Sequence, residues 1–307
     1  MIIDVYTHIL PKKYFQAFRK KVSTLHEGVE TRYPAVVDLD VRLRLMDRCP
    51  DVLQVLTVAQ PALDKLVSPE DAAELARIAN DELADLVVKY PDRFVSAAAC
   101  LPLNNIDAAL TEIDRAITQL ELSGIQIYGP INDEPLSSKK FWPIYEKMAD
   151  YDLPIWIHPN PTDFTTGVWG LEVVSSMAME NLISGGVFQD FPDIKFIIHH
   201  CGSMAPLLEG RLRFGPPPKA LGGVRNPLKY YKKFYTDTAT YGITGPMMLA
   251  YGFYDVKHIM FGTDTPLGPK WGITMESIKA VNRMNIPDAD KEAIFSENAI
   301  NLLKLIT

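Results

Sequence analysis

The sequence predicts an α/β protein built as a (β/α)8 barrel, the TIM-barrel fold, in a single domain with loop insertions. Two observations support this prediction. The apolar segments are mostly continuous runs and not alternating ones, which is typical of parallel strands buried on both faces. Eight such segments alternate with helical patterns over 307 residues, a length that suits one large barrel.

The expected strands are short apolar segments bounded by turn-forming residues. They span residues 2–8, 52–59, 94–101, 124–129, 154–159, 195–200, 234–240 and 258–266. An open doubly wound sheet is the alternative fold. That fold would carry a glycine-rich phosphate loop after its first strand, and the sequence YTHILPKK at this place is not such a loop. The predicted domain therefore covers residues 1–307.

Helical periodicity fills most intervals between these strands. Helices are expected at 68–89, 106–121, 141–151, 171–186, 205–213, 246–252, 273–283 and 288–305. Ser68 can cap its helix and Pro69 suits the first helical position. Asp38 or Asp40 is placed to cap a further helix before the second strand. The Pro/Gly-rich segment 215–227 is interpreted as a surface loop, with contact to a partner as the alternative.

The charge and cysteine content narrow the class of protein. The formal net charge is −7 and no long run of Lys and Arg exists, which argues against binding of nucleic acid or of an anionic membrane. Short basic clusters such as Arg42, Arg44 and Arg48 are expected to be solvated. The three cysteines, Cys49, Cys100 and Cys201, have no paired spacing, so we expect reduced thiols in a cytoplasmic protein.

Side chains that can bind metals or transfer protons follow several of the expected strands. Of the six histidines, four lie at strand ends: His8, His158, His199 and His200. Asp264 lies near the end of the last expected strand. In a barrel, the carboxyl ends of the strands converge on one mouth. We therefore expect these side chains to share a single pocket.

The side chains of His8, His158 and Asp264 together would form a donor set for one divalent metal ion. Two imidazoles and a carboxylate suit zinc, with manganese or iron(II) as alternatives. His200 is expected to point into the barrel, whereas His199 would alternate to the opposite side and pack among helices. Cys201 is not expected to act as a nucleophile.

These segments resemble the amidohydrolase superfamily, and in particular its branch of aminocarboxymuconate-semialdehyde, 2,3-dihydroxybenzoate and γ-resorcylate decarboxylases and related hydratases. The matching pieces are IIDVYTH, RLRLMD, GIQIYG, IWIHPN, KFIIHHCGS and MFGTDTP, in this order along the chain. The resemblance implies that His8, His158 and Asp264 bind one metal ion and that His200 is the catalytic histidine. Gln126 stands where members with two metal ions carry a bridging lysine, which agrees with a single metal.

The sequence departs from this family at position 6. Where the family usually has Asp-x-His-x-His, this chain has Asp4-Val-Tyr6-Thr-His8, so a tyrosine replaces the first metal-binding histidine. A phenol has an ordinary pKa of about 10 and binds a metal only when the metal lowers it. Three alternatives follow. Tyr6 binds the metal as a phenolate, or it hydrogen-bonds a substrate or a metal-bound water, or the site has lost its metal.

The resemblance implies a metal-dependent, non-oxidative decarboxylase of a hydroxylated aromatic or unsaturated carboxylic acid. Asp264 or His200 would protonate the carbon that bears the carboxylate. Several aromatic side chains are expected to flank a planar substrate: Tyr6, Tyr128, Trp156, Phe164 and Trp169.

Two other functions stay open at this point. One is a hydrolase or hydratase, in which a metal-bound water attacks a lactone, an amide or an alkene, or a metal-independent lactonase. The other is a barrel that binds a ligand without catalysis. Relatives in this branch are commonly dimers, so the resemblance also implies a homodimer.

Overall fold

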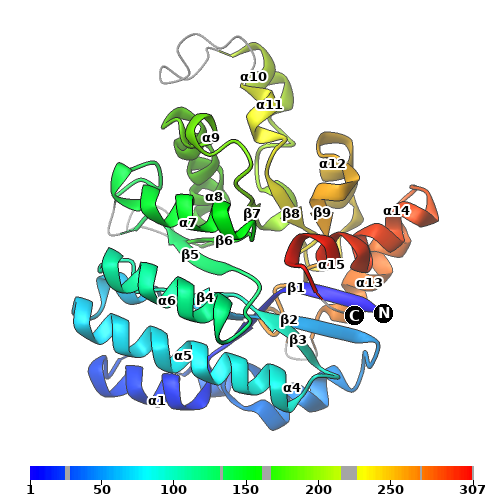
Figure 1. Cartoon of the computed structure of the whole chain (residues 1–307). Helices are drawn as coiled ribbons and strands as arrows, with labels where there is room; N and C mark the ends of the chain where they lie inside the picture. The colour runs from blue at the N-terminus through cyan, green and yellow to red at the C-terminus, as the bar shows by residue number, and fades with distance from the viewer. Residues whose placement is uncertain (25–27, 132–133, 161–166, 216–226, 270–271, 306–307) are drawn as a thin grey trace.

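The fold is a closed ring of parallel strands surrounded by helices (Figure 1). The computed structural model describes residues 1–24, 28–131, 134–160, 167–215, 227–269 and 272–305. Phe164 and most of the segment 215–227 lie outside these residues. The strands are β1 (Ile2–Ile9), β2 (Val52–Val58), β3 (Phe94–Ala97), β4 (Ala99–Cys100), β5 (Ile125–Gly129), β6 (Ile155–Pro159), β7 (Phe196–Ile198), β8 (Tyr235–Asp237) and β9 (Ile259–Met260).

Backbone hydrogen bonds close the two strand groups, β1–β3 and β4–β9, into one barrel. β3 and β4 are two parts of one strand interrupted at Ala98, whose N–H donates to the Leu56 carbonyl at 2.9 Å. At the other junction, the Val5 N–H donates to the Phe261 carbonyl at 2.9 Å and the Asp264 N–H donates to the Tyr6 carbonyl at 2.9 Å. The predicted eight-stranded barrel is therefore confirmed.

Helices cover the outside of this ring and follow the predicted order. They are α1 (Lys12–Lys21), α2 (Val29–Arg32), α3 (Pro34–Val37), α4 (Leu39–Met46), α5 (Pro69–Lys89), α6 (Ile106–Thr118), α7 (Trp142–Tyr151), α8 (Gly167–Ser184), α9 (Val187–Asp190), α10 (Glu209–Phe214), α11 (Leu228–Tyr231), α12 (Thr244–Phe253), α13 (Thr274–Asn282), α14 (Asp288–Glu292) and α15 (Asn298–Leu303).

The predicted helix starts are confirmed where a capping side chain was recognised. The Ser68 hydroxyl accepts from the Asp71 N–H, and the Asp38 carboxylate accepts from the Val41 N–H at the start of α4. Two helices differ from the prediction. The helix expected at 205–213 begins only at Glu209, and the helix expected at 288–305 is divided by a π-turn at Ala293–Glu297. In this turn the Ile294 carbonyl accepts from the Phe261 N–H at 2.7 Å, which ties the C-terminal helices to the barrel.

The barrel floor is a dry apolar cluster inside the ring. Its strand residues include Ile3, Val5, Trp156 and Ile197, and α15 contributes Ala299, Leu302 and Leu303 to the same cluster. Trp156 has no exposed surface, and its indole N–H donates to the Val5 carbonyl at 3.0 Å. A buried aromatic ring with a satisfied N–H stabilises the core and leaves that end of the barrel closed.

A β-bulge in β1 allows this strand to place side chains both in the barrel floor and at the mouth, the opposite end of the barrel. Asp4 pairs with Gln54 and Thr7 with Leu56, so two residues of β1 face one residue of β2. The bulge shifts the alternation of side chains, so that Val5 joins the floor whereas Tyr6 lies beside His8 at the other end. The buried Asp4 carboxylate supports this bend by accepting from the Thr263 hydroxyl at 2.6 Å and from the Tyr6 N–H at 3.3 Å.

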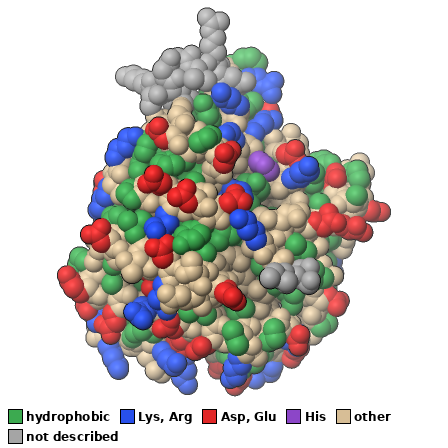
Figure 2. Space-filling view, in the orientation of Figure 1, with side chains coloured by type: hydrophobic (Ala, Val, Ile, Leu, Met, Phe, Trp, Pro, Cys, Tyr) green, Lys and Arg blue, Asp and Glu red, His purple; other side chains and the backbone are tan. Residues whose placement is uncertain are grey.

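The distribution of charged side chains on the surface agrees with the absence of a long run of Lys and Arg from the sequence. On the face in Figure 2, acidic and basic side chains are interspersed over the helices, without a continuous basic area. Within the described residues, no helix is both long and apolar enough to cross a membrane.

Candidate active site

The strand ends bring the predicted side chains into one site. The ring of Tyr6 lies 4.6 Å from that of His8 and 6.0 Å from those of His158 and His200, measured between centroids. The rings of His8 and His158 are 5.1 Å apart. His8 Nε2 lies 3.1 Å from Asp264 Oδ1. Side chains from β1 and β6, and from the segments after β7 and β9, therefore meet as the barrel geometry requires.

His8 and His158 are both held at their Nδ1 atoms, and His8 Nε2 faces Asp264 Oδ1 at 3.1 Å. The Thr57 hydroxyl lies 3.0 Å from His8 Nδ1 and donates its own proton to the Thr7 carbonyl, so it accepts from a protonated Nδ1. His158 Nδ1 lies 2.8 Å from the Pro159 carbonyl and donates to it. Burial, followed by the neighbouring histidines, holds the pKa of His158 well below its ordinary value. His158 thus presents an Nε2 lone pair, the form that binds metals.

The donor types fit a divalent cation, but the side chains are not arranged as a complete metal centre. His8 Nε2 is buried and has no hydrogen-bond partner, and its 3.1 Å separation from Asp264 Oδ1 is the spacing of two neighbouring ligands of one ion. Within the described residues, however, no three His, Cys, Asp or Glu side chains form a group that could hold a metal ion. The His8–Asp264 pair is the part of the site already at ligand spacing.

Tyr6 is a neutral phenol packed face to face against His199. It is 1% exposed, and its ring centroid lies 3.5 Å from that of His199 with planes 13° apart. Burial, reinforced by the charges of Asp264 and Asp237, holds the pKa of Tyr6 well above its ordinary value. A protonated phenol is a poor metal ligand, so this environment argues against the phenolate alternative.

The expectation that His199 packs among helices is wrong. Its imidazole lies inside the site, where Nδ1 is 2.6 Å from Asp237 Oδ2 at the end of β8. Both side chains are fully buried, and His199 Nε2 has no hydrogen-bond partner. Alternation in fact places His199 on the inner side with Ile197, because its backbone is still extended (φ −78°, ψ 175°). The left-handed backbone at His200 (φ 58°) then breaks the alternation, so that His200 also faces the site.

His200 is paired with a glutamate that the sequence alone did not indicate. His200 Nδ1 lies 2.8 Å from Glu172 Oε1, and Glu172 Oε2 accepts from the Ser203 hydroxyl at 2.6 Å. Burial opposes the charged imidazole, but the hydrogen bond and charge of Glu172 outweigh it and raise the pKa of His200 to about 9. His200 is therefore protonated at neutral pH and can donate from Nε2.

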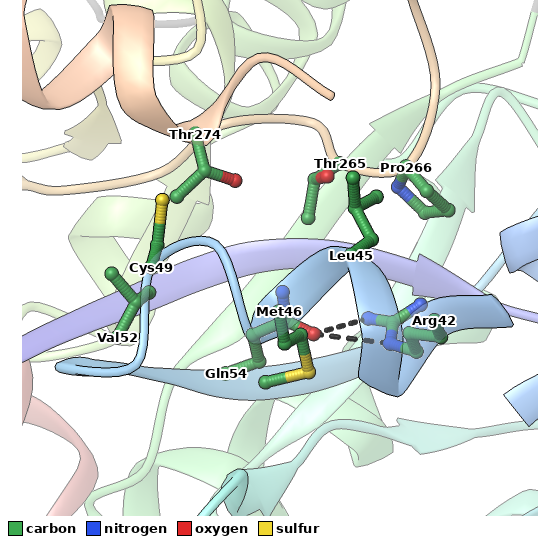
Figure 3. A pocket seen from close by; sticks show the side chains of 9 residues that line it. All are labelled: Arg42, Leu45, Met46, Cys49, Val52, Gln54, Thr265, Pro266 and Thr274. Carbon is green, nitrogen blue, oxygen red and sulfur yellow. Dashed lines mark hydrogen bonds between the residues drawn. The ribbon is translucent and has the colours of Figure 1, made fainter. Parts of the chain in front are cut away.

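A buried arginine supports the His8 end of β1, which corrects the expectation that Arg42 is solvated. Arg42 is 1% exposed, and its Nη1 donates to the His8 carbonyl at 2.5 Å. Figure 3 shows its guanidinium held on the Gln54 side-chain oxygen by two hydrogen bonds, beside a cavity of about 10 Å³. A space of this size holds about one water molecule, so Arg42 is not open to a substrate.

The aromatic residues expected around a substrate are placed differently from one another. Tyr6 lies in the site, and the Tyr128 ring lies 5.0 Å from that of His158. The Tyr128 hydroxyl donates to the Val58 carbonyl at 2.5 Å, beside the Gln126 amide. Trp156 belongs to the floor, where its ring is sealed from any ligand, so the expectation of a substrate contact is corrected. Trp169 is 79% exposed on α8.

The structure also adds Tyr241, whose hydroxyl donates to Asp264 Oδ2 at 2.8 Å. Asp237 ends the observed strand β8 but lies in the middle of the expected strand 234–240, so the sequence did not mark it as a strand-end residue. Glu172 lies within α8 and Tyr241 in a loop, and neither had a local pattern that could have indicated its partner. Five non-glycine residues with positive φ gather here, namely His200, Cys201, Ser203, Tyr241 and Asp264. Such strained backbone is typical of functional sites.

Comparisons with known proteins agree with this geometry. A model of the family described as Amidohydrolase matches residues 3–305. The 2-amino-3-carboxymuconate-6-semialdehyde decarboxylase of Dictyostelium discoideum is 28% identical, in an alignment that covers 99% of this chain and 91% of that protein. The 2-keto-4-carboxy-3-hexenedioate hydratase of a Sphingobium species is 26% identical, with 97% and 94% covered.

A solved structure shares the fold over nearly the whole chain. It is a crystal structure of a dihydroxybenzoic acid decarboxylase from Polaromonas sp. JS666 with bound manganese and the inhibitor 2-nitroresorcinol. It matches with a TM-score of 0.84 at 24% identity, covering 99% of this chain and 96% of that one. Since the family model spans almost all of the barrel that carries these histidines, the chain belongs to the amidohydrolase family.

Proposed function

We propose that this chain is a non-oxidative decarboxylase, a carbon–carbon lyase, of a hydroxylated aromatic or unsaturated carboxylic acid. The observation that supports this most is the His200–Glu172 pair, with 2.8 Å between Nδ1 and Oε1. It places a protonated imidazole in the same site as the neutral imidazole of His158 and the ionised Asp264. Groups whose surroundings separate their pKa values in this way take different roles in acid–base catalysis.

In this proposal His200 supplies the proton. Its Nε2–H protonates the carbon that bears the carboxylate, the bond between this carbon and the carboxylate breaks, and the electron pair of that bond restores conjugation as CO₂ leaves. His200 then regains a proton from solvent. Asp264 is the weaker choice: burial opposes its charge, but His8 outweighs burial and lowers the pKa of this carboxyl below its ordinary value. An ionised carboxylate has no proton to give.

The other side chains bind and orient the substrate. Tyr6 can donate its phenolic proton to a substrate oxygen, because burial keeps that proton in place. The Tyr128 ring lies beside His158, and its hydroxyl is already committed to the Val58 carbonyl, so it offers a flat surface and not a donor. The sequence predicts one divalent ion, zinc or manganese, on His8, His158 and Asp264, and of these donors only His8 and Asp264 already lie at ligand spacing. Such an ion, when bound, would act as a template and charge sink for the substrate carboxylate.

The proposal is tested by product analysis with a metal determination on the same protein. Purified protein is incubated with a panel of hydroxybenzoates and a panel of lactones, and release of CO₂ is compared with release of acid. We expect CO₂ from at least one hydroxybenzoate and about one zinc or manganese per chain by elemental analysis. Acid release from lactones without CO₂ would overturn the decarboxylase assignment.

A hydratase is the second candidate, because one relative at 26% identity is a hydratase of an unsaturated acid. The same site would then add water to a double bond, with His200 again as the proton donor. Addition of water increases the product mass by one water molecule, whereas decarboxylation lowers it by one CO₂. Mass spectrometry of reactions with unsaturated dicarboxylic acids therefore separates the two functions.

We also propose a homodimer. The helix α8 is apolar on several sides, and it leaves Val168, Trp169 and Met177 exposed by 75%, 79% and 51%. Large exposed apolar side chains of this kind often mark contacts between proteins. Light scattering after gel filtration gives the mass in solution. A monomeric mass at micromolar concentration would contradict the dimer.

A further inference from the structure

A buried carboxylate at the end of β8 contacts both histidines that follow β7. Asp237 has no exposed surface, and its Oδ2 lies 2.6 Å from His199 Nδ1. Its Oδ1 accepts from the His200 N–H at 3.0 Å and from the Ala239 N–H at 3.0 Å. One side chain therefore holds the imidazole of His199 and the backbone of His200, although both histidines follow a different strand.

These contacts determine which nitrogen of His199 carries the proton. Because two backbone N–H groups donate to Oδ1, Asp237 acts as a hydrogen-bond acceptor, and His199 donates to its Oδ2 from Nδ1. Burial outweighs the opposing effect of Asp237 and lowers the pKa of His199, so the ring is neutral and its single N–H is the one at Nδ1. His199 Nε2, which is buried without a hydrogen-bond partner, keeps its lone pair.

The same carboxylate anchors the turn that directs His200 into the site. His200, Cys201 and Ser203 have φ values of 58°, 59° and 57°, in the left-handed region that residues with a side chain rarely adopt. Such backbone persists only where the surrounding structure holds it. Asp237 Oδ1 binds the N–H at the start of this turn, and the His200 ring lies 6.0 Å from that of Tyr6 between centroids. The position of the His200 side chain therefore depends on a carboxylate of the neighbouring strand.

Close packing fixes Asp237 and His199 against Tyr6. The rings of His199 and Tyr6 are stacked at 3.5 Å between centroids, with planes 13° apart. A Cβ atom at Gly262, after β9, would lie 2.7 Å from Asp237 Cβ and 3.2 Å from Tyr6 Cβ, so only glycine leaves room for both side chains. Packing and hydrogen bonds therefore restrain the same carboxylate.

We propose that Asp237 is a positioning residue, which holds His199 in the Nδ1–H tautomer and presents the His200 side chain to the substrate through the turn after β7. This rests on the proposed function in assigning the transferred proton to His200. Asp237 has no exposed surface, and both of its oxygens are engaged by protein groups. Its replacement should therefore act on the reaction through the two histidines.

The test compares two buried aspartates by the tautomer of His199. In Asp237→Asn a single acceptor oxygen remains, and if it keeps the two backbone N–H groups, the amide NH₂ faces His199 Nδ1 and the ring proton must move to Nε2. Asp4→Asn is the matched control, because Asp4 is equally buried but accepts from Thr263 and from the Tyr6 N–H instead of a histidine. ¹⁵N NMR of the histidine-labelled full-length protein reports the tautomer, and His199→Gln assigns the signals by their loss. We expect Nδ1–H in the wild type and in Asp4→Asn, and Nε2–H in Asp237→Asn.

Activity gives the second readout. In Asp237→Asn, kcat for CO₂ release should fall by about 10²-fold, the cost of displacing a reacting group by about 1 Å, and KM should change less than kcat. The melting temperature, measured in parallel, shows that the variant is folded.

Four outcomes overturn the inference. They are an Nε2–H tautomer of His199 in the wild type, an unchanged tautomer in Asp237→Asn, the same change in Asp4→Asn, and an unchanged kcat in Asp237→Asn after the tautomer has changed. The wild-type tautomer is measured without any substitution, so the inference stays falsifiable even if Asp237→Asn does not fold. Because NMR needs no substrate, the expected tautomers in a protein that releases no CO₂ would sustain the action of Asp237 on His199 and contradict the proposed decarboxylase.

Discussion

The floor and the mouth of this barrel are made by the same strands, yet they differ in almost every physical respect. β6 shows the contrast within three residues: Trp156 is sealed in the apolar floor, whereas His158, two residues further along, faces four other rings in the mouth. In the floor the one indole N–H is satisfied by a backbone carbonyl. In the mouth the Nε2 atoms of His8 and His199 are buried without a hydrogen-bond partner.

Burial therefore has different consequences in the floor and in the mouth, even along one strand. Apolar burial in the floor lowers the free energy of the folded state. Burial in the mouth costs stability, because polar atoms are desolvated without full compensation, and it separates the pKa values of neighbouring groups. The floor should therefore respond to substitution through the free energy of unfolding and the mouth through activity. The experiments below test that division, from the largest expected effect to the smallest.

Replacing the proton donor should abolish most of the activity without unfolding the protein. For His200→Gln we expect kcat to fall by about 10²–10⁴-fold, the usual contribution of a positioned general acid. CO₂ release and the melting temperature are measured in parallel. His258→Gln is the matched control, because His258 stacks on Tyr235 outside the mouth and should leave kcat unchanged. Nearly full activity in His200→Gln would show that His200 is not the proton donor.

Replacing Trp156 in the floor should lower the stability of the protein and leave its activity largely unchanged. Trp156→Ala should lower the free energy of unfolding by about 3–5 kcal/mol, because it leaves a cavity in a closed apolar cluster. Urea denaturation gives this value, and KM measured at low temperature, where the variant stays folded, should change little. A large rise in KM with unchanged stability would indicate that Trp156 contacts the substrate and would contradict its assignment to the floor.

An added imidazole at position 6 should strengthen metal binding in the mouth. Tyr6→His replaces a neutral, buried phenol by a donor that zinc and manganese accept, next to His8 at 4.6 Å between ring centroids. We expect the affinity for the metal to rise on the order of tenfold by competition with a chelator. An unchanged affinity would place position 6 outside the coordination shell altogether.

The pH dependence should depend on Glu172. Since the pKa of His200 is raised to about 9, the protonated and active form is present below that pH, and activity should fall as the pH rises through about 9. Glu172→Gln removes the charge that holds this proton, so the alkaline loss should move toward the ordinary pKa of about 6.5. A profile of kcat against pH measures the shift. Ser203→Ala, which leaves the His200–Glu172 contact in place, should shift it less, and identical profiles in Glu172→Gln and the wild type would refute the pairing.

The smallest effect is expected at Cys201. Burial holds the pKa of its thiol well above the ordinary value, so no thiolate is present to act as a nucleophile. Cys201→Ser should keep kcat within about twofold of the wild type, and Cys201 itself should resist thiol-directed alkylation while the protein is folded, in contrast to the partly exposed Cys49. Rapid inactivation by iodoacetamide would show that the mouth admits more solvent than the buried cysteine suggests.

Most of the fold could be predicted from the sequence, because strands buried on both faces need continuous apolar runs and helices need apolar residues at helical spacing. The eight strand positions and the caps at Ser68 and Asp38 were recognised from these local patterns. The family was also recognised from the sequence, and a family model over residues 3–305 confirms it. The roles of His8, His158, His200 and Asp264 stay predictions, although the structure does bring their side chains together.

What the sequence determined by itself is the position of each strand along the chain, since each strand is an apolar run. The expected ends of the last three strands, at 200, 240 and 266, lie beyond the observed ends at Ile198, Asp237 and Met260. What only the tertiary structure decided is which side chain meets which. The β-bulge turns Tyr6 toward the mouth, where it stacks on His199, and the left-handed turn brings His200 beside the same ring. The pairing of Glu172 with His200 and of Tyr241 with Asp264 likewise joins residues far apart in the chain. Such contacts depend on the closure of the ring, and no local pattern of residues can encode a distance across it.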